Sequence, residues 1–263
     1  MLDQINDKDG TVGKAMKLLD IVESFRKPIK FNDILERSPY PKPSTYRLLQ
    51  TLANQNMLFF NADTGHYSLG SRLIRLAYSA WQTASLAPIA SSYLEELSTK
   101  TGETIHLAQL DHGQVLYVDK KNSNRPIVMF SGAGKIGPAY CTGVGKAMLA
   151  HIDYEKCQKI IAQQSFYPHT KHTLVSAEAL NKELKEIYEQ GVAFDREEHE
   201  PSIICIAVPI LTKSKEVVGG ISITSSTARM SLEELANYKE ILQQTAQQIG
   251  EDAAVWMLPK MGG

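Results

Sequence analysis

Three prolines restrict the first part of this chain to short helices. Pro28 ends the segment 11–27, in which apolar residues recur every three or four positions, as on one face of a helix. Pro41 ends a second and shorter segment, and Pro43 suits the first turn of a third helix that continues to Leu52. The sequence therefore predicts three short helices, the last two joined by a tight turn.

A hairpin is expected to follow these helices. Residues 57–60 and 66–69 have the apolar and aromatic composition of strands, and they flank the segment 61–65, which is rich in Asn, Asp and Gly. The second helix is expected to start at Asp33, which stands three residues before Glu36 in the spacing of a capping box. Three helices and a hairpin are the parts of a winged helix-turn-helix.

The third helix has one apolar face and one polar face. At 100° per residue, the leucines of the segment 48–52 lie on one side. Arg47 and Gln50 lie opposite them, with Tyr46 on the border between the faces. A forked cation, an amide and a phenol can reach phosphates and base edges in the major groove of DNA. The alternative is a structural or protein-binding module, because helix triplets of this kind are common.

Charge is distributed unevenly along the chain. Residues 1–80 contain 11 Lys and Arg against 8 Asp and Glu, whereas residues 81–263 contain 17 against 21. The small basic excess of the first part agrees with a nucleic-acid partner, since phosphate contacts supply most of the affinity for DNA.

Neither a membrane anchor nor a disulfide framework is expected. No run of about 18 apolar residues occurs, and the first ten residues lack the order of a secretory signal, which favours a cytoplasmic location with no membrane partner. Cys141, Cys157 and Cys205 are odd in number and form no Cys-x-x-Cys pair, so reduced thiols are expected.

The rest of the chain mixes helices and strands. Residues 71–100 predict two helices with a break near Pro88. Residues 103–110 and 114–120 predict a hairpin, and 127–130 a third strand. Further helices are expected at 143–151, 153–163, 176–190 and 231–256, and further strands at 192–195, 203–211 and 217–224.

Five segments carry a resemblance to a known family. They are Ser44–Leu52, Tyr67–Gly70, Gly137–Ala147, Gly191–Glu198 and Cys205–Pro209. Their sequences, in this order, are similar to those of the IclR family of bacterial transcriptional regulators. Because the resemblance spans about residues 10–258, it is more specific than any single motif.

The resemblance implies an α/β protein of two domains. A winged helix-turn-helix at 1–70 would be followed by a linker helix at 71–84 and by a GAF-like mixed α/β effector-binding domain at 85–263. A second chain is expected to cover the apolar linker helix, giving a homodimer or homotetramer that presents paired recognition helices to a double-stranded operator. By resemblance, the candidate DNA contacts are Lys42, Pro43, Ser44, Thr45, Tyr46, Arg47 and Gln50.

The resemblance also implies a pocket for a small organic acid. Its residues map to Gly143, Val144, Asp195, Cys205, Ser222 and Thr224, with Met129, Ile136 and Ile203 as apolar walls. Strand alternation independently directs the hydroxyls of Ser222 and Thr224 to one face. Asp195 is expected to accept a ligand hydroxyl proton or to be protonated itself, because two facing anions repel. Taken singly, each of these polar residues also has a purely structural explanation.

Two other chemistries are disfavoured. Gly143-Val144-Gly145-Lys146 resembles the end of a P-loop, but Ala147 replaces the required Ser or Thr, and Tyr140 replaces the first glycine. A hydrolytic enzyme with an accessory helical domain would use Cys205 as nucleophile beside His199, yet an apolar strand suppresses the thiolate. Neither a cofactor nor a metal site is indicated.

The sequence thus predicts a ligand-responsive regulator, a repressor of a catabolic operon. Thr104–Leu107, Val118–Lys120 and the region of Ile223 and Arg229 look closest to the subgroup that answers to keto-deoxy-sugar acids. Short keto acids and aromatic acids are the alternatives.

Overall fold

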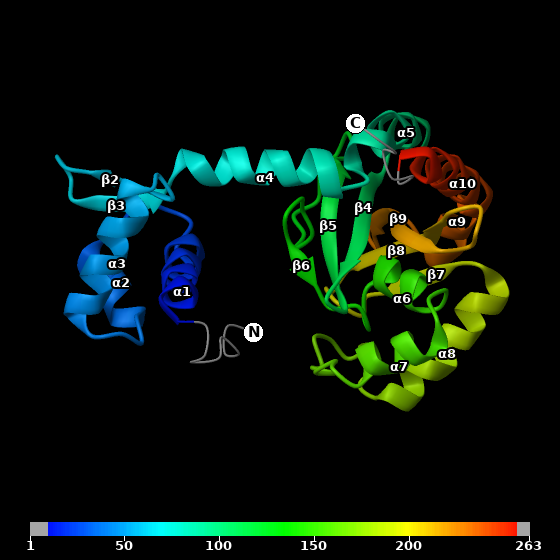
Figure 1. The fold of residues 1–263 in the computed structure, drawn as a ribbon. Coiled ribbons are helices and arrows are strands. Elements are labelled where there is room, and N and C mark those ends of the chain that lie inside the picture. The colour runs from blue at the N-terminus through cyan, green and yellow to red at the C-terminus, as the bar shows by residue number, and fades with distance from the viewer. Residues whose placement is uncertain (1–9, 257–263) are drawn as a thin grey trace. The chain divides into compact units, whose positions relative to one another are not determined.

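The computed structural model describes residues 10–256, and the chain divides into two compact units between Thr83 and Ala84 (Figure 1). Each unit has its own buried core. The segment 71–84 forms one helix, α4 (Ser71–Ala84), which belongs almost entirely to the first unit.

Besides α4, the described part of the first unit contains three helices and a small antiparallel sheet. The sheet has the strand order β1-β3-β2, and leucines and isoleucines of all three helices form the core beneath it. The elements are α1 (Gly10–Ser24), β1 (Ile29–Lys30), α2 (Phe31–Arg37), α3 (Lys42–Asn54), β2 (Leu58–Asn61) and β3 (His66–Leu69). The pattern of helix, turn, helix and hairpin therefore forms as the periodicity predicts.

Two details of this unit differ from the sequence expectation. Helix α2 begins at Phe31 rather than at Asp33, because Asp33 occupies the third position of the helix and its carboxylate accepts a hydrogen bond from the Lys30 N–H at 2.9 Å. The residues after Pro28 also form β1, which pairs Ile29 with Tyr67 and closes the sheet. Strand β1 has only two residues, which is too short for the alternation of apolar and polar residues to be recognised in the sequence.

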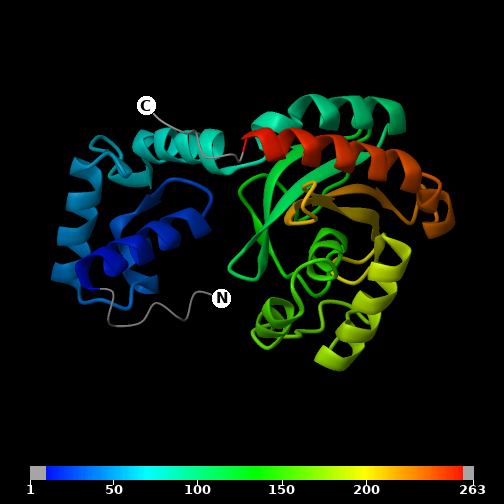
Figure 2. The same ribbon diagram turned by 45° about the vertical axis from the view of Figure 1, so that its right-hand side comes forward.

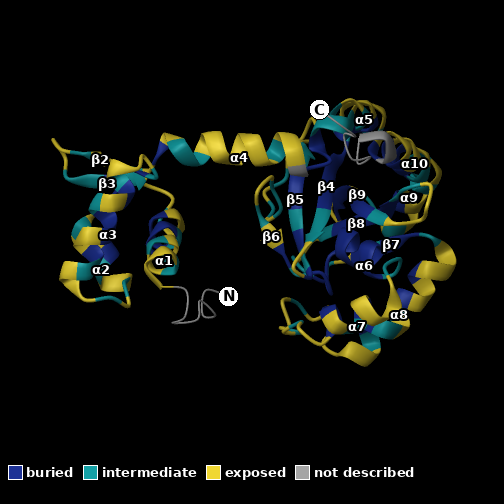
Figure 3. Cartoon of the chain, viewed as in Figure 1, coloured by how far each residue is buried: buried dark blue, intermediate teal, exposed yellow. Residues whose placement is uncertain are grey.

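Helix α4 exposes much of its apolar surface (Figure 3). Ile74 is 75% exposed and Tyr78 is 62% exposed, and the ring of Tyr78 stacks on Trp81. The helix ends before Ser85, not at Pro88, because Pro88 lies in the first turn of the next helix, where no backbone donor is required.

The second unit is built on a six-stranded antiparallel sheet. The strand order is β6-β5-β4-β9-β8-β7, so strands from both ends of the unit meet at the centre of the sheet. The elements are α5 (Ala87–Thr101), β4 (Thr104–Asp111), β5 (Gln114–Lys121), β6 (Ile136–Gly137), α6 (Gly143–Leu149), α7 (Tyr154–Ile161), α8 (Ala177–Gln190), β7 (Ala193–Arg196), β8 (Ile203–Leu211), β9 (Val217–Ser226), α9 (Leu232–Ala236) and α10 (Lys239–Trp256).

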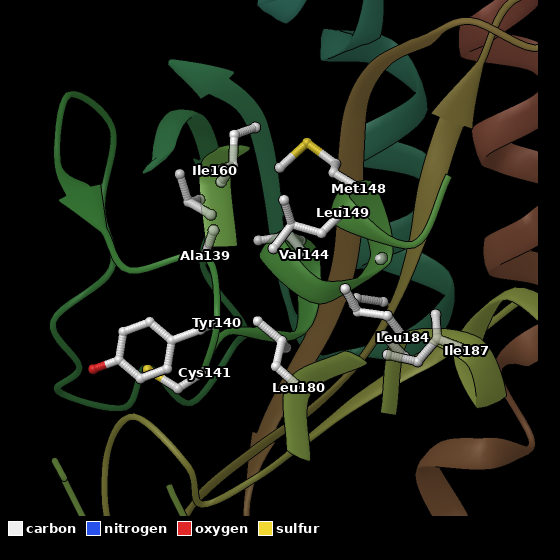
Figure 4. Packing of buried hydrophobic residues seen from close by; sticks show 14 of the residues in the cluster. Ala139, Tyr140, Cys141, Val144, Met148, Leu149, Ile160, Leu180, Leu184 and Ile187 are labelled. Atoms are coloured by element: carbon white, nitrogen blue, oxygen red, sulfur yellow. The ribbon is translucent and has the colours of Figure 1, made fainter. Parts of the chain in front are cut away.

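Helices cover both faces of this sheet. Helices α5 and α10 pack together on one face, and α6 lies on the other face against β8 and β9 (Figures 1 and 2). Val144 and Met148 of α6 join residues of α7 and α8 in a core cluster that includes Leu180 and Leu184 (Figure 4). The sheet is therefore buried on both faces, and a cavity on the α6 side is walled by packed structure.

Two sequence expectations for this unit are wrong. No strand forms at 127–130, because the Phe130 N–H donates to the Glu200 carboxylate at 2.9 Å rather than to a neighbouring strand. The third strand is β6, which pairs with Val115 and Leu116. The final helix is divided into α9 and α10, since a hydrogen bond from the Tyr238 N–H to the Leu235 carbonyl tightens the turn between them.

Across the described part of the chain, no helix has both the length and the apolar composition that crossing a lipid bilayer requires.

Candidate functional sites

Helix α3 presents a free polar face in the first unit. Tyr46 is 53% exposed and Arg47 is also exposed, whereas Gln50 is half-buried. Lys42 and Pro43 are exposed in the first turn of the helix. Six of the seven residues proposed for DNA contact keep some accessible surface: Lys42, Pro43, Ser44, Tyr46, Arg47 and Gln50. A cation, a phenol and an amide on one open helix face have the chemistry to read DNA.

Thr45 is the exception, and its expected role as a DNA contact is corrected. Its side chain is completely buried. Its hydroxyl lies 2.9 Å from the Ser38 hydroxyl and donates to the Tyr40 carbonyl at 3.2 Å, while the Tyr40 N–H donates to the Ser38 hydroxyl at 3.2 Å. Thr45 therefore holds the turn between α2 and α3 and fixes the angle at which α3 is presented.

The turn of the hairpin is organised by one side chain. The Asn61 side-chain oxygen accepts hydrogen bonds from the N–H groups of Asp63 at 3.0 Å and Thr64 at 3.1 Å. Gly65 then adopts a φ of 68°, a left-handed conformation that favours glycine. The hairpin is consequently a defined projection beside α3, as a wing must be.

The second unit contains a cavity between α6 and the sheet, with about 390 Å³ of space not filled by atoms when the open solvent at its mouth is included. Strand pairing explains its floor, because Asp195 of β7 lies opposite Cys205 of β8, and Cys205 lies opposite Thr224 of β9. Two residues before Thr224 on β9, Ser222 lies opposite His106 of β4. The cavity is lined by His106, Tyr117, Ser131, Thr142, Gly143, Val144, Asp195, His199, Glu200, Ile203, Cys205, Ser222 and Thr224.

Seven of the nine residues proposed for the pocket line this cavity. The expectation fails for Met129 and Ile136, which are not among the lining residues. Ile136 is 48% exposed, and Met129 lies in the segment that forms no strand. In a strand at 127–130, alternate side chains would have pointed to the same face, and Met129 was expected to line the cavity. The observed loop does not have this alternation.

Asp195 is the buried acid of the cavity. Its Oδ1 accepts a hydrogen bond from the Glu198 N–H at 2.7 Å. Burial, and then the nearby charge of Glu198, raise the pKa of Asp195 to about 7, although Lys146 and the backbone N–H of His199 oppose the shift. This carboxyl group is therefore poised to gain or lose a proton near neutral pH.

Sequence reasoning missed the polar residues on the opposite wall. His106 is buried; its Nδ1 lies 3.1 Å from the Thr224 hydroxyl and its Nε2 lies 2.8 Å from the Ser131 hydroxyl. Strand alternation carried a signal for His106, because a polar side chain within an apolar strand must face a polar partner. Ser131 gave no such signal, since it lies in a loop.

The Gly-Val-Gly-Lys segment belongs to a buried ion cluster rather than to a phosphate site. Lys146 is completely buried, and its Nζ lies 2.5 Å from Glu198 Oε1 and 3.2 Å from Glu183 Oε1. Arg196 adds a contact of 2.7 Å to the same oxygen of Glu183. The lysine of this segment is thus engaged within the fold and is not free to reach a phosphate.

The geometry gives no support to a cysteine nucleophile. Burial, and then the charge of Asp195, raise the pKa of the Cys205 thiol far above its usual value. Among the described residues, no group of three or more His, Cys, Asp or Glu side chains is arranged to hold a metal ion.

A winged helix-turn-helix joined to a unit with a polar cavity is the construction of a ligand-responsive transcriptional regulator. Comparison with known families narrows this class. Residues 11–59 match the IclR helix-turn-helix domain, and residues 78–251 match the C-terminal domain of the bacterial transcriptional regulator IclR. The chain belongs to the IclR family, and it is a DNA-binding regulator that responds to an effector, not an enzyme.

Individual relatives agree over almost the whole chain. The HTH-type transcriptional regulator KdgR of Escherichia coli is 32% identical over 93% of this chain and 94% of its own length. The HTH-type transcriptional regulator XynR of the same organism is 30% identical over 89% of this chain and 93% of its own. The solved structure of Thermotoga maritima IclR, which is 27% identical, superimposes with a TM-score of 0.76 over 91% of this chain and 97% of that one.

Proposed function

We propose that this protein represses a catabolic operon in the cytoplasm and that a small organic acid, of the keto-deoxy-sugar-acid class, releases the repression. The observation that carries the proposal is the cavity, which Ser222, Thr224 and Ser131 line together with the carboxyl group of Asp195. A hydroxylated acid fits such a lining, because each hydroxyl of the ligand can both donate and accept. Repression is supported by relatives, one of which is the transcriptional repressor IclR of Escherichia coli.

A thermal-shift screen tests the effector. Sugar acids, short keto acids and aromatic acids are added in turn to the full-length protein, and the unfolding midpoint is measured, since a ligand that binds only the folded state raises it. We expect the largest rise with a keto-deoxy-sugar acid and a smaller rise after Ser222→Ala. A larger rise with an aromatic acid would contradict the proposed class and leave the regulator function intact.

For DNA binding, we propose that the free face of α3 enters the major groove. Replacing Arg47 with alanine is expected to weaken operator binding about 10- to 100-fold, because one well-placed contact to a base edge contributes about 1–3 kcal/mol. The measurement is a fluorescence-anisotropy titration with the upstream DNA of the protein's own gene at fixed salt concentration. The matched control is Lys185→Ala, which removes one exposed cation from α8. Equal loss in both variants would indicate a general charge effect and would contradict base reading by Arg47.

We propose that a second copy of this chain packs against α4. Ile74 and Tyr78 stand four residues apart on this helix, and both are more than half exposed. Packing a second chain against these apolar side chains is favourable, because it removes their surface from water. A dimer, or a tetramer made of two dimers, would have paired copies of α3 to present to successive turns of the DNA groove.

Acid binding is expected to weaken as the pH rises through about 7. Below that pH, Asp195 is protonated and can donate a hydrogen bond; above it, the carboxylate repels an anionic ligand. We expect the affinity to fall up to about tenfold per pH unit above the pKa, measured by calorimetric titration from about pH 6 to about pH 8.5.

The control for this pH dependence is Asp195→Asn, which keeps an oxygen for the Glu198 N–H but cannot ionise. Its affinity is expected to stay nearly constant over the same range. Because the folded pKa of Asp195 lies above its ordinary value, stability is lost as the pH rises from about 4 to about 7, and the whole loss is present above about pH 7. The variant should therefore be more stable than the wild type at about pH 8.5, and a parallel pH dependence in the two proteins would contradict this account.

A further inference from the structure

Four polar side chains form a continuous hydrogen-bonded row along one wall of the cavity. Ser131 contacts His106 Nε2 at 2.8 Å, His106 Nδ1 contacts the Thr224 hydroxyl at 3.1 Å, and that hydroxyl lies 3.5 Å from the Ser222 hydroxyl. His106, Ser222 and Thr224 are all at least 96% buried. The row starts in the loop before β6 and ends at the cavity floor on β9.

The imidazole in this row is neutral. Burial, and then the positive charge of Lys120, lower the pKa of His106 to about 3. A neutral imidazole carries its hydrogen on one nitrogen only, so one neighbouring hydroxyl accepts a hydrogen bond from His106 and the other donates one to it. The tautomer of His106 therefore sets the direction of its hydrogen bonds to Ser131 and Thr224.

The tautomer also decides what the row offers to a ligand. With the hydrogen on Nδ1, the Thr224 oxygen accepts from His106, and the hydroxyl hydrogens of Thr224 and Ser222 are left to point into the cavity. With the hydrogen on Nε2, the Thr224 hydroxyl donates to His106, and its oxygen is left to accept. Toward the cavity, the Thr224 hydroxyl is therefore a hydrogen-bond donor in the first case and an acceptor in the second.

The tautomer of His106 matters for binding an acid because of the residues that line the cavity. Among the described residues, the cavity lining contains no lysine or arginine, while Asp195 and Glu200 both contribute carboxyl groups. A carboxylate bound here must be held by neutral donors rather than by a cation. Thr224 is such a donor only when His106 donates to it, because its single hydroxyl hydrogen is otherwise used on the imidazole.

We infer that His106 is a specificity-determining positioning residue, whose Nδ1–H tautomer orients the hydroxyl of Thr224 to donate, beside that of Ser222, to the carboxylate of the effector. In this state His106 Nε2 accepts from the Ser131 hydroxyl. That loop residue is held in place by a hydrogen bond from Lys120 Nζ to its carbonyl at 3.0 Å. The inference rests on the proposed function, since it concerns how the proposed acid is recognised in the same cavity.

The inference predicts selectivity as well as affinity. A primary carboxamide presents an N–H₂ group where an acid presents a second oxygen, so an aligned pair of donors rejects it. His106 should therefore contribute to the ratio of acid affinity to amide affinity. A residue that only filled space in the sheet would leave this ratio unchanged.

Calorimetric titration of the full-length protein tests the inference with 2-keto-3-deoxygluconate, pyruvate and 4-hydroxybenzoate, and with the primary amide of the acid that binds most tightly. His106→Asn retains an amide that reaches Thr224, and we expect an affinity within about threefold of the wild type. His106→Gln reaches toward Ser131 instead, and His106→Phe keeps only a ring. Both should bind the acid at least about tenfold more weakly and lose most of the selectivity over the amide.

Different outcomes would overturn different statements. If the wild type binds the acid and the Asn and Gln variants match each other in affinity and selectivity, the role of His106 is wrong while the proposed function stands. The comparison of these two polar variants holds even if His106→Phe does not fold. If the wild type binds none of the three acids, the proposed effector class is wrong, and the inference falls with it.

Discussion

Replacing Lys146 with methionine is expected to lower the free energy of unfolding by about 3–5 kcal/mol, the usual cost of removing one partner from a buried ion pair. Methionine fills most of the same volume, so the loss is electrostatic rather than a cavity effect. Glu198 is 3% exposed, and its Oε2 already has no hydrogen-bond partner in the structure. Without the Lys146 ammonium 2.5 Å away, its carboxylate would keep only the more distant and half-exposed Arg196 guanidinium, 4.0 Å away, as a compensating charge.

Chemical denaturation at about pH 7 measures this loss, with the slope of the transition used to check that the denatured state is unchanged. The matched control is Lys185→Met on the exposed face of α8, which should change stability by no more than about 0.5 kcal/mol. Adding Glu198→Gln to Lys146→Met should restore part of the loss, because it removes the unpaired charge. A loss below about 1 kcal/mol for Lys146→Met would contradict the electrostatic account.

Replacing Gly145 with alanine is expected to cost about 3 kcal/mol, at the upper end of the range for overpacking a core. A Cβ atom at this position would lie 2.4 Å from the Ala139 carbonyl oxygen and 2.6 Å from the Ala139 Cα. Both are backbone atoms, so the strain cannot be relieved by rotating a side chain. Helix α6 would have to move away from the segment that precedes it.

Gly132→Ala is the matched control, because a Cβ at Gly132 meets no atom within 4 Å and its φ is not left-handed. We expect its thermal unfolding midpoint to stay within a few degrees of the wild type, while that of Gly145→Ala falls by about 10 °C or more. Equal midpoints for the two variants would show that α6 is less tightly packed than the structure indicates.

Together these two variants separate a packing motif from a nucleotide-binding motif. In a P-loop, the glycines bring the backbone close to a phosphate and the lysine reaches for it. Here Gly145 allows close contact with Ala139, and Lys146 neutralises Glu198 and Glu183. The substitutions should consequently change folding stability without any effect that depends on nucleotide.

Local patterns were sufficient to predict most of the elements. Helix α3 and its polar face follow from the positions of its leucines, and the hairpin after it follows from the turn residues at 61–65. The shared face of Ser222 and Thr224 follows from strand alternation, and both residues line the cavity. These predictions succeeded because the periods of 3.6 and 2 residues are properties of the local backbone.

Contacts between distant residues were not accessible in this way. The expected strand at 127–130 is absent because Glu200, far along the chain, accepts the Phe130 N–H, and Met129 was assigned to the cavity through that false strand. The helical wheel places Thr45 at about the angle of Leu52, on the packed face, and only the resemblance made it a candidate DNA contact; its hydrogen bond to the Tyr40 carbonyl in the turn could not be read from the wheel.

The sequence by itself determined the winged helix, most of the helices and strands of the second unit and the family to which the chain belongs, since all of these are encoded in local periodicity and contiguous motifs. The tertiary structure alone decided which side chains meet. It pairs His106 with Thr224 across 118 positions of the chain, and it buries Lys146 against Glu198. The physical reason is that strand order and helix packing are set by the whole core, so neighbours in space need not be neighbours in sequence.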